Sequence, residues 1–264
     1  MIPAQQLRCR IEKRELTTGL LVSNHLWPQL VEIAMAGGLD YLIADTEHLD
    51  HGAARIAEVC ALGRIAGFPI LLRTRSTDEA SVRAAMDIGP CGLLLPNVER
   101  AEQLDEVKKA TYLPPRGGRR PGGPGNFWVQ QYDYDAFKTV VEDNLIVIPQ
   151  VESQEGLDNA AEIAAHELTT ALGIGPFDLS AQLGVCGKGI AHPRMSSAVD
   201  QLRSAADAAD KPMWMIGPPR PLIDQGFRFL CIGDVFHFLC NSLRSELDEL
   251  KHLSQADASD SLGS

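Results

Sequence analysis

The sequence is short of basic residues and has no long apolar run. It contains 24 Lys and Arg against 35 Asp and Glu, a formal net charge of −11 at pH 7. Nucleic acids and anionic membranes both need a basic footprint, so we expect neither as a partner. No apolar run reaches the roughly 18 residues of a membrane span, and the N-terminus lacks the apolar core of a signal peptide. Small anionic substrates stay open, because local Arg residues can reverse the field inside a pocket.

Paired cysteines are also lacking. The six cysteines form no Cys-x-x-Cys pair and show no spacing typical of metal ligands. Most of them lie in apolar runs, where cysteine usually behaves as a small buried hydrophobe. A reducing cytoplasm is the expected location for a chain that uses Cys9, Cys60, Cys91, Cys186, Cys231 and Cys240 in this way.

The chain does have enough apolar material for one large core. It has 264 residues, of which 45% are hydrophobic and 22% charged. No linker-like change of composition divides it, and an α/β barrel of about 250 residues commonly forms one domain. We predict a single domain over residues 1–253. Ser254 to Ser264 are small and polar with interspersed acids, which predicts a disordered tail.

Strand-like and helix-like patterns alternate eight times, which predicts a (β/α)₈ TIM-type barrel rather than an open sheet. The expected strands are Thr17–Ser23, Tyr41–Ala44, Pro69–Thr74, Gly92–Val98, Leu145–Val151, Thr170–Ile174, Met213–Ile216 and Arg228–Ile232. The expected helices are Pro28–Ala36, Ala53–Ala66, Ala80–Ile88, Ala101–Ala110, Tyr134–Val141, Gly156–His166, Ser197–Ala209, Arg220–Gln225 and Val235–Leu253.

Two carboxylates follow successive apolar strands. Glu152 comes directly after the strand that ends at Val151, and Asp178 follows the strand that ends at Ile174. Neighbouring parallel strands lie about 4.8 Å apart, so these two side chains could share one divalent cation. The alternative is that both acids merely cap the helices that follow them, since acids are good N-caps.

Other polar residues lie at or just after the carboxyl ends of the predicted strands as well. In a barrel of this kind the active site lies at the carboxyl ends of the strands. So many convergent polar groups, which mix acids with a His and an Arg, indicate chemistry rather than chance. They are Asp45, Glu47, His48, Arg73, Asn97, Glu99 and Gln150.

A series of short motifs resembles the HpcH/HpaI aldolase family in order and approximate spacing, from about residue 15 to about residue 250. The motifs are Asp45-Thr46-Glu47-His48, Arg73, Met86-Asp87-Ile88-Gly89, Gln150-Val151-Glu152 and Gly175-Pro176-Phe177-Asp178-Leu179-Ser180. The resemblance implies a metal-dependent (class II) pyruvate aldolase. Such an enzyme reversibly cleaves a 4-hydroxy-2-oxo acid to pyruvate and an aldehyde through a metal-stabilised enolate.

The resemblance also implies a cofactor and catalytic residues. Glu152 and Asp178 match the family's metal ligands. Two carboxylates completed by waters suit Mg²⁺ or Mn²⁺, while Co²⁺ or Zn²⁺ could substitute, and no organic cofactor is expected. Arg73 would stabilise the enolate oxygen. His48 would transfer protons, and Asp87 matches the residue that holds the imidazole.

Further residues are expected around the substrate. Gly175 and Pro176 would let a backbone N–H approach the substrate carboxylate, because Gly adds no side chain there. Gln150 points the same way along its strand as Glu152 and could donate to the oxo acid. Asp45 and Glu47 are expected to support waters on the metal.

Three other activities compete with this one. A Schiff-base aldolase needs a Lys at a strand end, and all lysines fall in predicted helices or loops. A family member that uses oxaloacetate, as a decarboxylase or in a citrate-synthase-like condensation, stays open. A barrel that only binds its ligand would not need a pair of metal-binding carboxylates, a base and an Arg together. The lysines are Lys13, Lys108, Lys109, Lys138, Lys188, Lys211 and Lys251.

The chain departs from the family pattern in two places. The family's Arg-Gly-x-Gly loop is replaced by a stretch in which Arg119 takes the Arg position and Arg120 the Gly position. Phe177 is bulkier than the Ala, Ser or Asn that we associate with its position. These differences leave the aldehyde acceptor open.

The final predicted helix indicates an oligomer. Residues 235–243 are apolar around most of the helix, unlike an outer barrel helix with one wet face. The family resemblance points to a hexamer built as a trimer of dimers that exchange this helix. The alternative is that the segment before Thr17 covers the helix within one chain.

Overall fold

The computed structural model describes residues 1–120, 122–130 and 133–261. Eight parallel strands close into a barrel, because β1 pairs with both β2 and β8, which confirms the predicted (β/α)₈ fold. Every predicted strand is present. The strands are β1 (Thr17–Val22), β2 (Tyr41–Asp45), β3 (Ile70–Arg73), β4 (Gly92–Leu95), β5 (Ile146–Val151), β6 (Leu172–Ile174), β7 (Met213–Ile216) and β8 (Phe229–Asp234).

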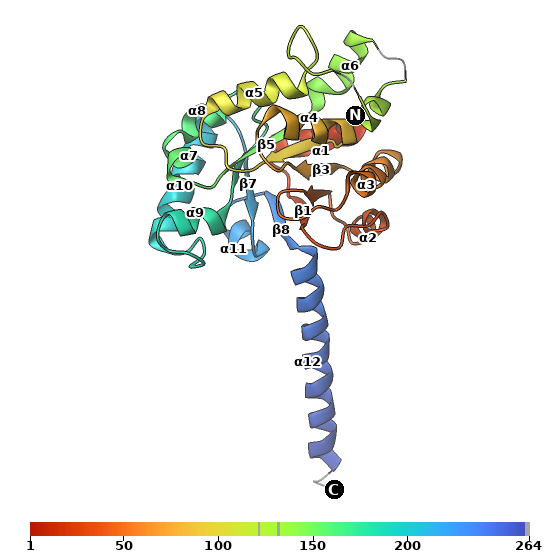
Figure 1. Ribbon diagram of the computed structural model, residues 1–264. Helices are drawn as coiled ribbons and strands as arrows, with labels where there is room; N and C mark the ends of the chain where they lie inside the picture. Colours follow the sequence, from red (N-terminus) through yellow and green to blue (C-terminus); the bar gives the residue numbers. More distant parts are fainter. Residues whose placement is uncertain (121, 131–132, 262–264) are drawn as a thin grey trace.

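The helices surround this barrel (Figure 1). The helix predicted from Gly156 to His166 is two short helices that break at Asn159, whose side chain donates to the Glu99 carbonyl. The helices that follow the strands are α2 (Leu30–Ala36), α3 (Ala53–Ala66), α4 (Glu79–Ile88), α5 (Ala101–Thr111), α7 (Gln154–Asp158), α8 (Ala160–Ala165), α9 (Pro176–Gln182), α10 (Pro193–Ala208), α11 (Pro219–Asp224) and α12 (Val235–Ser261).

The barrel core is filled by large side chains that also satisfy one another's polar atoms. The Tyr41 hydroxyl donates to the Leu230 carbonyl at 2.9 Å and accepts from the Trp214 indole at 2.9 Å. Tyr41 fits because its register partner on β1 is Gly19, where an added Cβ would lie 2.5 Å from the Tyr41 ring. Buried Tyr and Trp need such partners, so this cluster fixes one packing of the core.

A first helix, α1 (Ile2–Glu12), was not predicted from the sequence. Its buried residues Ala4, Leu7 and Ile11 recur at steps of three and four, but its other positions are mostly polar. It packs against β1 and against the short 3₁₀ helix η2 (Glu142–Asn144). The alternative in which this segment covers the last helix is therefore wrong.

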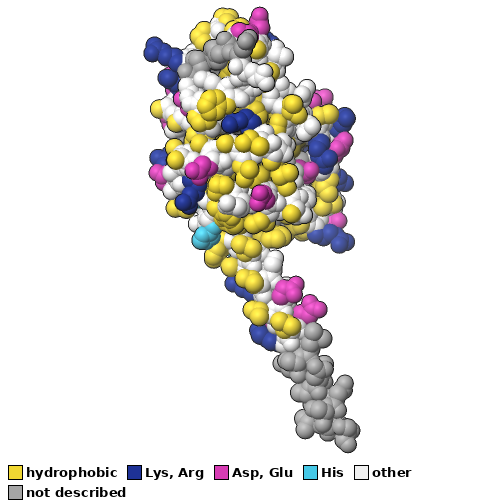
Figure 2. Space-filling view, turned by 90° about the vertical axis from the view of Figure 1, so that its right-hand side faces the viewer, with side chains coloured by type: hydrophobic (Ala, Val, Ile, Leu, Met, Phe, Trp, Pro, Cys, Tyr) yellow, Lys and Arg dark blue, Asp and Glu magenta, His cyan; other side chains and the backbone are white. Residues whose placement is uncertain are grey.

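The last helix, α12, leaves the barrel at the end of β8 and projects away as a stalk (Figure 1). It continues past Ser254 as far as Ser261, so a helix occupies residues 254–261 where the sequence predicted a disordered tail. Its apolar side chains are exposed along the stalk next to the barrel (Figure 2). Among the described residues, no helix is both long enough and apolar enough to cross a membrane.

The long connection between α5 and β5 lies at the other end of the barrel from α12 (Figure 1). It contains the 3₁₀ helix η1 (Pro124–Trp128) and α6 (Tyr134–Val140). Because strands of a (β/α)₈ barrel run toward the catalytic face and helices run back, this connection lies at the amino ends of the strands.

Candidate active site

The two predicted metal ligands lie beside each other at the carboxyl ends of β5 and β6. Val151 is the register partner of Ile174, so Glu152 is next to Gly175. A Cβ on Gly175 would lie 2.5 Å from both Cγ and Oε1 of Glu152, so only glycine leaves room for this carboxylate. Asp178 lies in the first turn of α9, directly after this glycine.

Neither carboxylate caps a helix. The Ser153 hydroxyl accepts from the Gly156 N–H at 3.1 Å and caps α7, while Gly175 is the N-cap residue of α9. Helix capping therefore does not explain Glu152 or Asp178. The alternative raised from the sequence is wrong.

The N–H of Gly175 is not available to a substrate. It donates to the Val151 carbonyl at 3.0 Å, as part of the ladder between β5 and β6. Gly175 makes space for Glu152. A backbone N–H that approaches the substrate carboxylate here would come from the first turn of α9, which has no side-chain cap, and this role stays a prediction. Pro176 has no N–H and begins α9, a position that suits its fixed φ.

Gln150 also reaches the site, two residues before Glu152 on β5. It is buried, and its Nε2 donates to the Ile174 carbonyl at a long 3.5 Å. Its Oε1 is buried with no hydrogen-bond partner. The unpartnered atom is an acceptor, whereas the sequence predicted that Gln150 donates to the oxo acid, so this contact stays a prediction.

Arg73 is held rigidly by the neighbouring strand. Asp45 and Arg73 are register partners on β2 and β3. The guanidinium donates two hydrogen bonds to the carboxylate, from Nε to Oδ1 at 2.8 Å and from Nη2 to Oδ2 at 2.5 Å. Nη1 lies 3.2 Å from Oε2 of Glu47. Arg has five N–H donors, so two of them are not used by these contacts.

Asp45 is saturated by protein groups rather than by waters on a metal. It is fully buried, and it also accepts from the Glu47 N–H at 3.0 Å and from the Ser23 hydroxyl at 2.7 Å. Burial tends to raise the pKa of Asp45, but the hydrogen bonds and charge of Arg73 outweigh burial and hold that pKa below its usual value. Asp45 therefore orients Arg73, which corrects the role that the sequence suggested.

Ser23 was missed in the sequence. It follows β1 as the other polar residues follow their strands, and this position was the only available signal. Its N–H donates to Oδ2 of Asp234 at 3.2 Å, while its hydroxyl reaches Asp45. Ser23 thus links Asp234, the last residue before α12, to Asp45, the carboxylate that holds Arg73.

The electrostatics of the site favour a bound cation. Burial, reinforced by the negative charges of Glu47 and Asp178, raises the pKa of Glu152 to about 8, although Arg73 opposes the rise. Burial also raises the pKa of Glu47. Glu47 and Glu152 therefore lie near a guanidinium that Asp45 already pairs, and Asp178 adds a third negative charge beside Glu152.

A divalent cation suits this arrangement. In the described part of the chain, no three His, Cys, Asp or Glu side chains are grouped as metal ligands. The protein would thus offer the two carboxylates of Glu152 and Asp178, with waters or substrate oxygens completing the shell. This donor set fits a hard ion that keeps several waters, as Mg²⁺ does.

The two residues predicted to form a catalytic pair lie at opposite ends of the barrel. His48 follows β2 at the carboxyl end, its side chain is 59% exposed, and its Nε2 lies 3.9 Å from Oε2 of Glu47. Asp87 lies in the last turn of α4, next to the connection between α5 and β5. Asp87 therefore cannot hold His48 within one chain.

Arg119 fixes Asp87 in place. Its side chain is fully buried, and its Nη2 donates to Oδ1 of Asp87 at 2.8 Å. Gly123 packs against the same residue, since a Cβ there would lie 2.5 Å from the Asp87 carbonyl oxygen. The Gly-rich stretch, whose role the sequence left open, thus presents a partly exposed Asp87 at the surface.

Comparison with known sequences agrees with these features. The model of the HpcH/HpaI aldolase/citrate lyase family matches residues 20–214. The hydroxypyruvate/pyruvate aldolase of Chromohalobacter salexigens is 34% identical over 210 residues, which cover 76% of this chain and 81% of that protein. The 5-keto-4-deoxy-D-glucarate aldolase of Escherichia coli is 30% identical over 213 residues, which cover 78% and 81%.

Solved structures share the fold. An HpcH/HpaI aldolase from Desulfitobacterium hafniense superposes with a TM-score of 0.84 at 24% identity, covering 93% of this chain and 96% of that one. The citrate synthase SbnG superposes with a TM-score of 0.78 at 20% identity, covering 94% and 98%. Aldolases are carbon–carbon lyases, and both sequence relatives carry that name. The chain belongs to the HpcH/HpaI aldolase/citrate lyase family.

Proposed function

We propose that this chain is a divalent-metal-dependent aldolase that reversibly cleaves a 4-hydroxy-2-oxo acid into pyruvate and an aldehyde. Glu152 and Asp178, side by side after β5 and β6 and with no helix-capping role, carry the proposal, because two such carboxylates are a donor set that suits a divalent cation. Glu152 and Asp178 would hold Mg²⁺ or Mn²⁺. A bound ion would polarise the carboxylate and carbonyl oxygens of the oxo acid and so make C3 acidic.

The protein groups would orient the oxo acid and offset its charge. Arg73 is preorganised by Asp45, so its two remaining N–H groups can donate to the oxygen that gains negative charge without reorganisation. The amide of Gln150 lies two residues before Glu152 and can hold the acid from the β5 side. Preorganised donors in a buried site act more strongly than donors in water.

His48 would move the proton between the aldehyde oxygen and solvent. An imidazole can both accept and donate a proton, which suits both directions of a reversible cleavage. Its position beside Glu47 and Arg73 places it at the rim of the site, where the aldehyde must enter and leave.

Oxaloacetate is the second candidate substrate. The same oxo-acid half would bind, and the similarity to the fold of SbnG keeps a condensation or decarboxylation open. The departures at Phe177 and at Arg120 affect the acceptor rather than the oxo acid. Only product analysis separates the two substrates.

Two assays test the proposal. With Mg²⁺ in D₂O, we expect the methyl protons of pyruvate to exchange for deuterium, as followed by NMR. With pyruvate and a panel of aldehydes, we expect 4-hydroxy-2-oxo acids by mass spectrometry. Conversion of oxaloacetate without any aldehyde condensation would favour the second candidate, and no exchange of pyruvate protons would exclude both.

We further propose that α12 mediates a homo-oligomer. Its exposed apolar side chains recur at steps of three and four, which forms a seam along one side of a helix of 27 residues: Phe236, Leu239, Leu243, Leu247 and Leu250. Such a seam normally packs against another helix or subunit. The oligomer that we propose is a hexamer built as a trimer of dimers that exchange α12. We also propose the cytoplasm as location and no nucleic-acid or membrane partner, which the acidic balance supports.

Light scattering tests the oligomer. We expect a mass several times the 28.7 kDa of the chain, and the double variant Leu243→Asp, Leu247→Asp should lower it, because two charges would enter the seam. Ser242→Asp with Ser245→Asp on the same helix is the matched control. A monomeric wild-type protein would contradict the proposal. A variant truncated before Val235 that stays folded and keeps the same number of subunits would also contradict it.

A further inference from the structure

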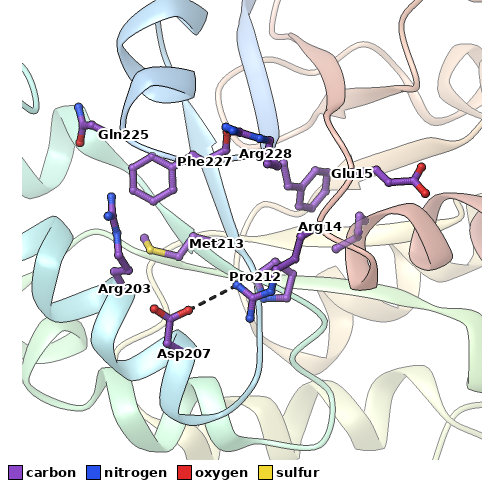
Figure 3. A pocket seen from close by; sticks show the side chains of 12 residues that line it. Arg14, Glu15, Arg203, Asp207, Pro212, Met213, Gln225, Phe227 and Arg228 are labelled. Atoms are coloured by element: carbon purple, nitrogen blue, oxygen red, sulfur yellow. Dashed lines mark hydrogen bonds and ion pairs between the residues drawn. The ribbon is translucent and has the colours of Figure 1, made fainter.

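A cavity opens at the amino ends of β7 and β8, at the opposite end of the barrel from Glu152 and Asp178. Its volume is about 230 Å³. Its walls come from α10, from the start of β7, from the α11–β8 loop and from the segment between α1 and β1 (Figure 3). The cavity is therefore separate from the candidate active site.

The cationic groups of the cavity are not balanced by its acids. Asp207 is paired with Arg14 at 3.4 Å, as the dashed line in Figure 3 marks, and Glu15 is paired at 3.4 Å with Arg10 outside the cavity. Arg203 and Arg228 have no carboxylate within ion-pair distance among the described residues. Two guanidinium groups thus face this space without a counter-charge.

The hydrogen bonds of these two arginines differ. Nη1 of Arg228 donates to the carbonyls of Ile223 and Phe227, which fixes its direction. Nε of Arg203 is buried with no hydrogen-bond partner. The two Nη atoms of Arg203 take part in no hydrogen bond or ion pair of the described residues, so they are the donors that an acceptor in the cavity would meet.

Most of the remaining lining is apolar, with Gln225 as a further polar side chain. The Arg203 guanidinium lies over the Phe227 ring, 4.4 Å from its centroid, and the two side chains face each other in Figure 3. Met213 and Phe229 are buried and line the same space. Stacking on the ring holds Arg203 in one direction beside these apolar side chains.

We propose that this cavity binds a small organic acid that combines one carboxylate with a flat apolar body. The carboxylate would pair with Arg203 and Arg228, and the body would lie against Phe227 and Met213. The volume lies below the roughly 300 Å³ at which sites for drug-sized ligands begin, so the ligand has few heavy atoms. A phosphate ion would satisfy the charge but leave the apolar wall exposed to water.

Benzoate is the probe for this site, and isothermal titration calorimetry is the measurement. The titrations use the full chain with EDTA present and are repeated on Glu152→Gln, so that no metal in the active site can bind the carboxylate. We expect benzoate to bind in both. Benzyl alcohol, which keeps the ring without the charge, and inorganic phosphate, which keeps the charge without the ring, should each bind about tenfold more weakly or worse.

Two variants test the arginines. Arg203→Gln and Arg228→Gln should each weaken benzoate binding about tenfold or more, while Arg194→Gln, on the same helix as Arg203 but near the other end, should not. Circular dichroism checks that each variant is folded. If only one of the two arginine variants folds, that variant alone tests the proposal. No benzoate binding at millimolar concentration, or equal binding to both folded variants, would overturn the proposal. Phosphate binding as tightly as benzoate would refute the apolar part.

Discussion

Removal of the divalent cation is expected to lower carbon–carbon cleavage by at least about 10³-fold, because a Lewis acid contributes several kcal/mol at the developing oxyanion. Among the described residues, no Lys lies at the carboxyl end of a strand where it could replace the metal as electrophile. The assay compares enzyme treated with EDTA with the same enzyme after Mg²⁺ is added back. Full activity after metal removal, or trapping of pyruvate on the protein by borohydride, would show a Schiff-base mechanism.

Glu152→Gln should match the loss caused by EDTA, because it removes one of two anionic ligands. Glu155→Gln, three residues later on the exposed side of α7, is the matched control and should keep its activity. Calorimetry with Mn²⁺ should show a large loss of metal affinity in the first variant only.

Metal affinity should also depend on pH in a defined direction. The pKa of Glu152 is raised to about 8 without a metal, so below that pH a proton competes with the cation for this carboxylate. The cation binds the ionised form, so affinity should rise about tenfold per pH unit up to pH 8 and then level off. An affinity that stays constant between pH 6 and pH 8 would contradict this charge cluster.

His48→Ala is expected to lower turnover by roughly 10²–10⁴-fold, the usual contribution of a general acid–base group. Metal affinity should stay nearly unchanged, because His48 contacts Glu47 but neither Glu152 nor Asp178 among the described contacts. His166→Ala, whose side chain pairs with Asp105 far from the site, is the control. An equal loss of metal binding in His48→Ala would make this residue a ligand.

Asp87→Asn should lower turnover less than His48→Ala does. The position of Asp87 also allows a test that distinguishes action within one chain from action between chains. Asp87 lies at the other end of the barrel from His48, so it can act on this imidazole only from a second copy of the chain. Inactive His48→Ala and weakened Asp87→Asn chains, co-expressed with different tags, should then regain activity in mixed oligomers. Mixed oligomers no more active than Asp87→Asn alone would remove Asp87 from the catalytic mechanism.

The sequence by itself determined the barrel and the order of its strands, although β4 ends at Leu95 rather than at the predicted Val98. Continuous apolar runs such as Ile146–Val151 can only be buried on both faces, and their alternation with helices predicts parallel pairing. Because carboxyl ends of parallel strands meet at one edge, Glu152 and Asp178 could be placed together before any coordinates existed. The neighbouring positions of Asp45 and Arg73 followed from the same periodicity.

Only the tertiary structure decided what these side chains do to one another. Asp45 proved to hold Arg73, and Gly175 to make room for Glu152, because register and close approach are set between strands rather than along one. The distance between Asp87 and His48 depends on which end of a helix faces which end of the barrel. The cavity at Arg203 joins segments far apart in the sequence, so no local pattern predicts it.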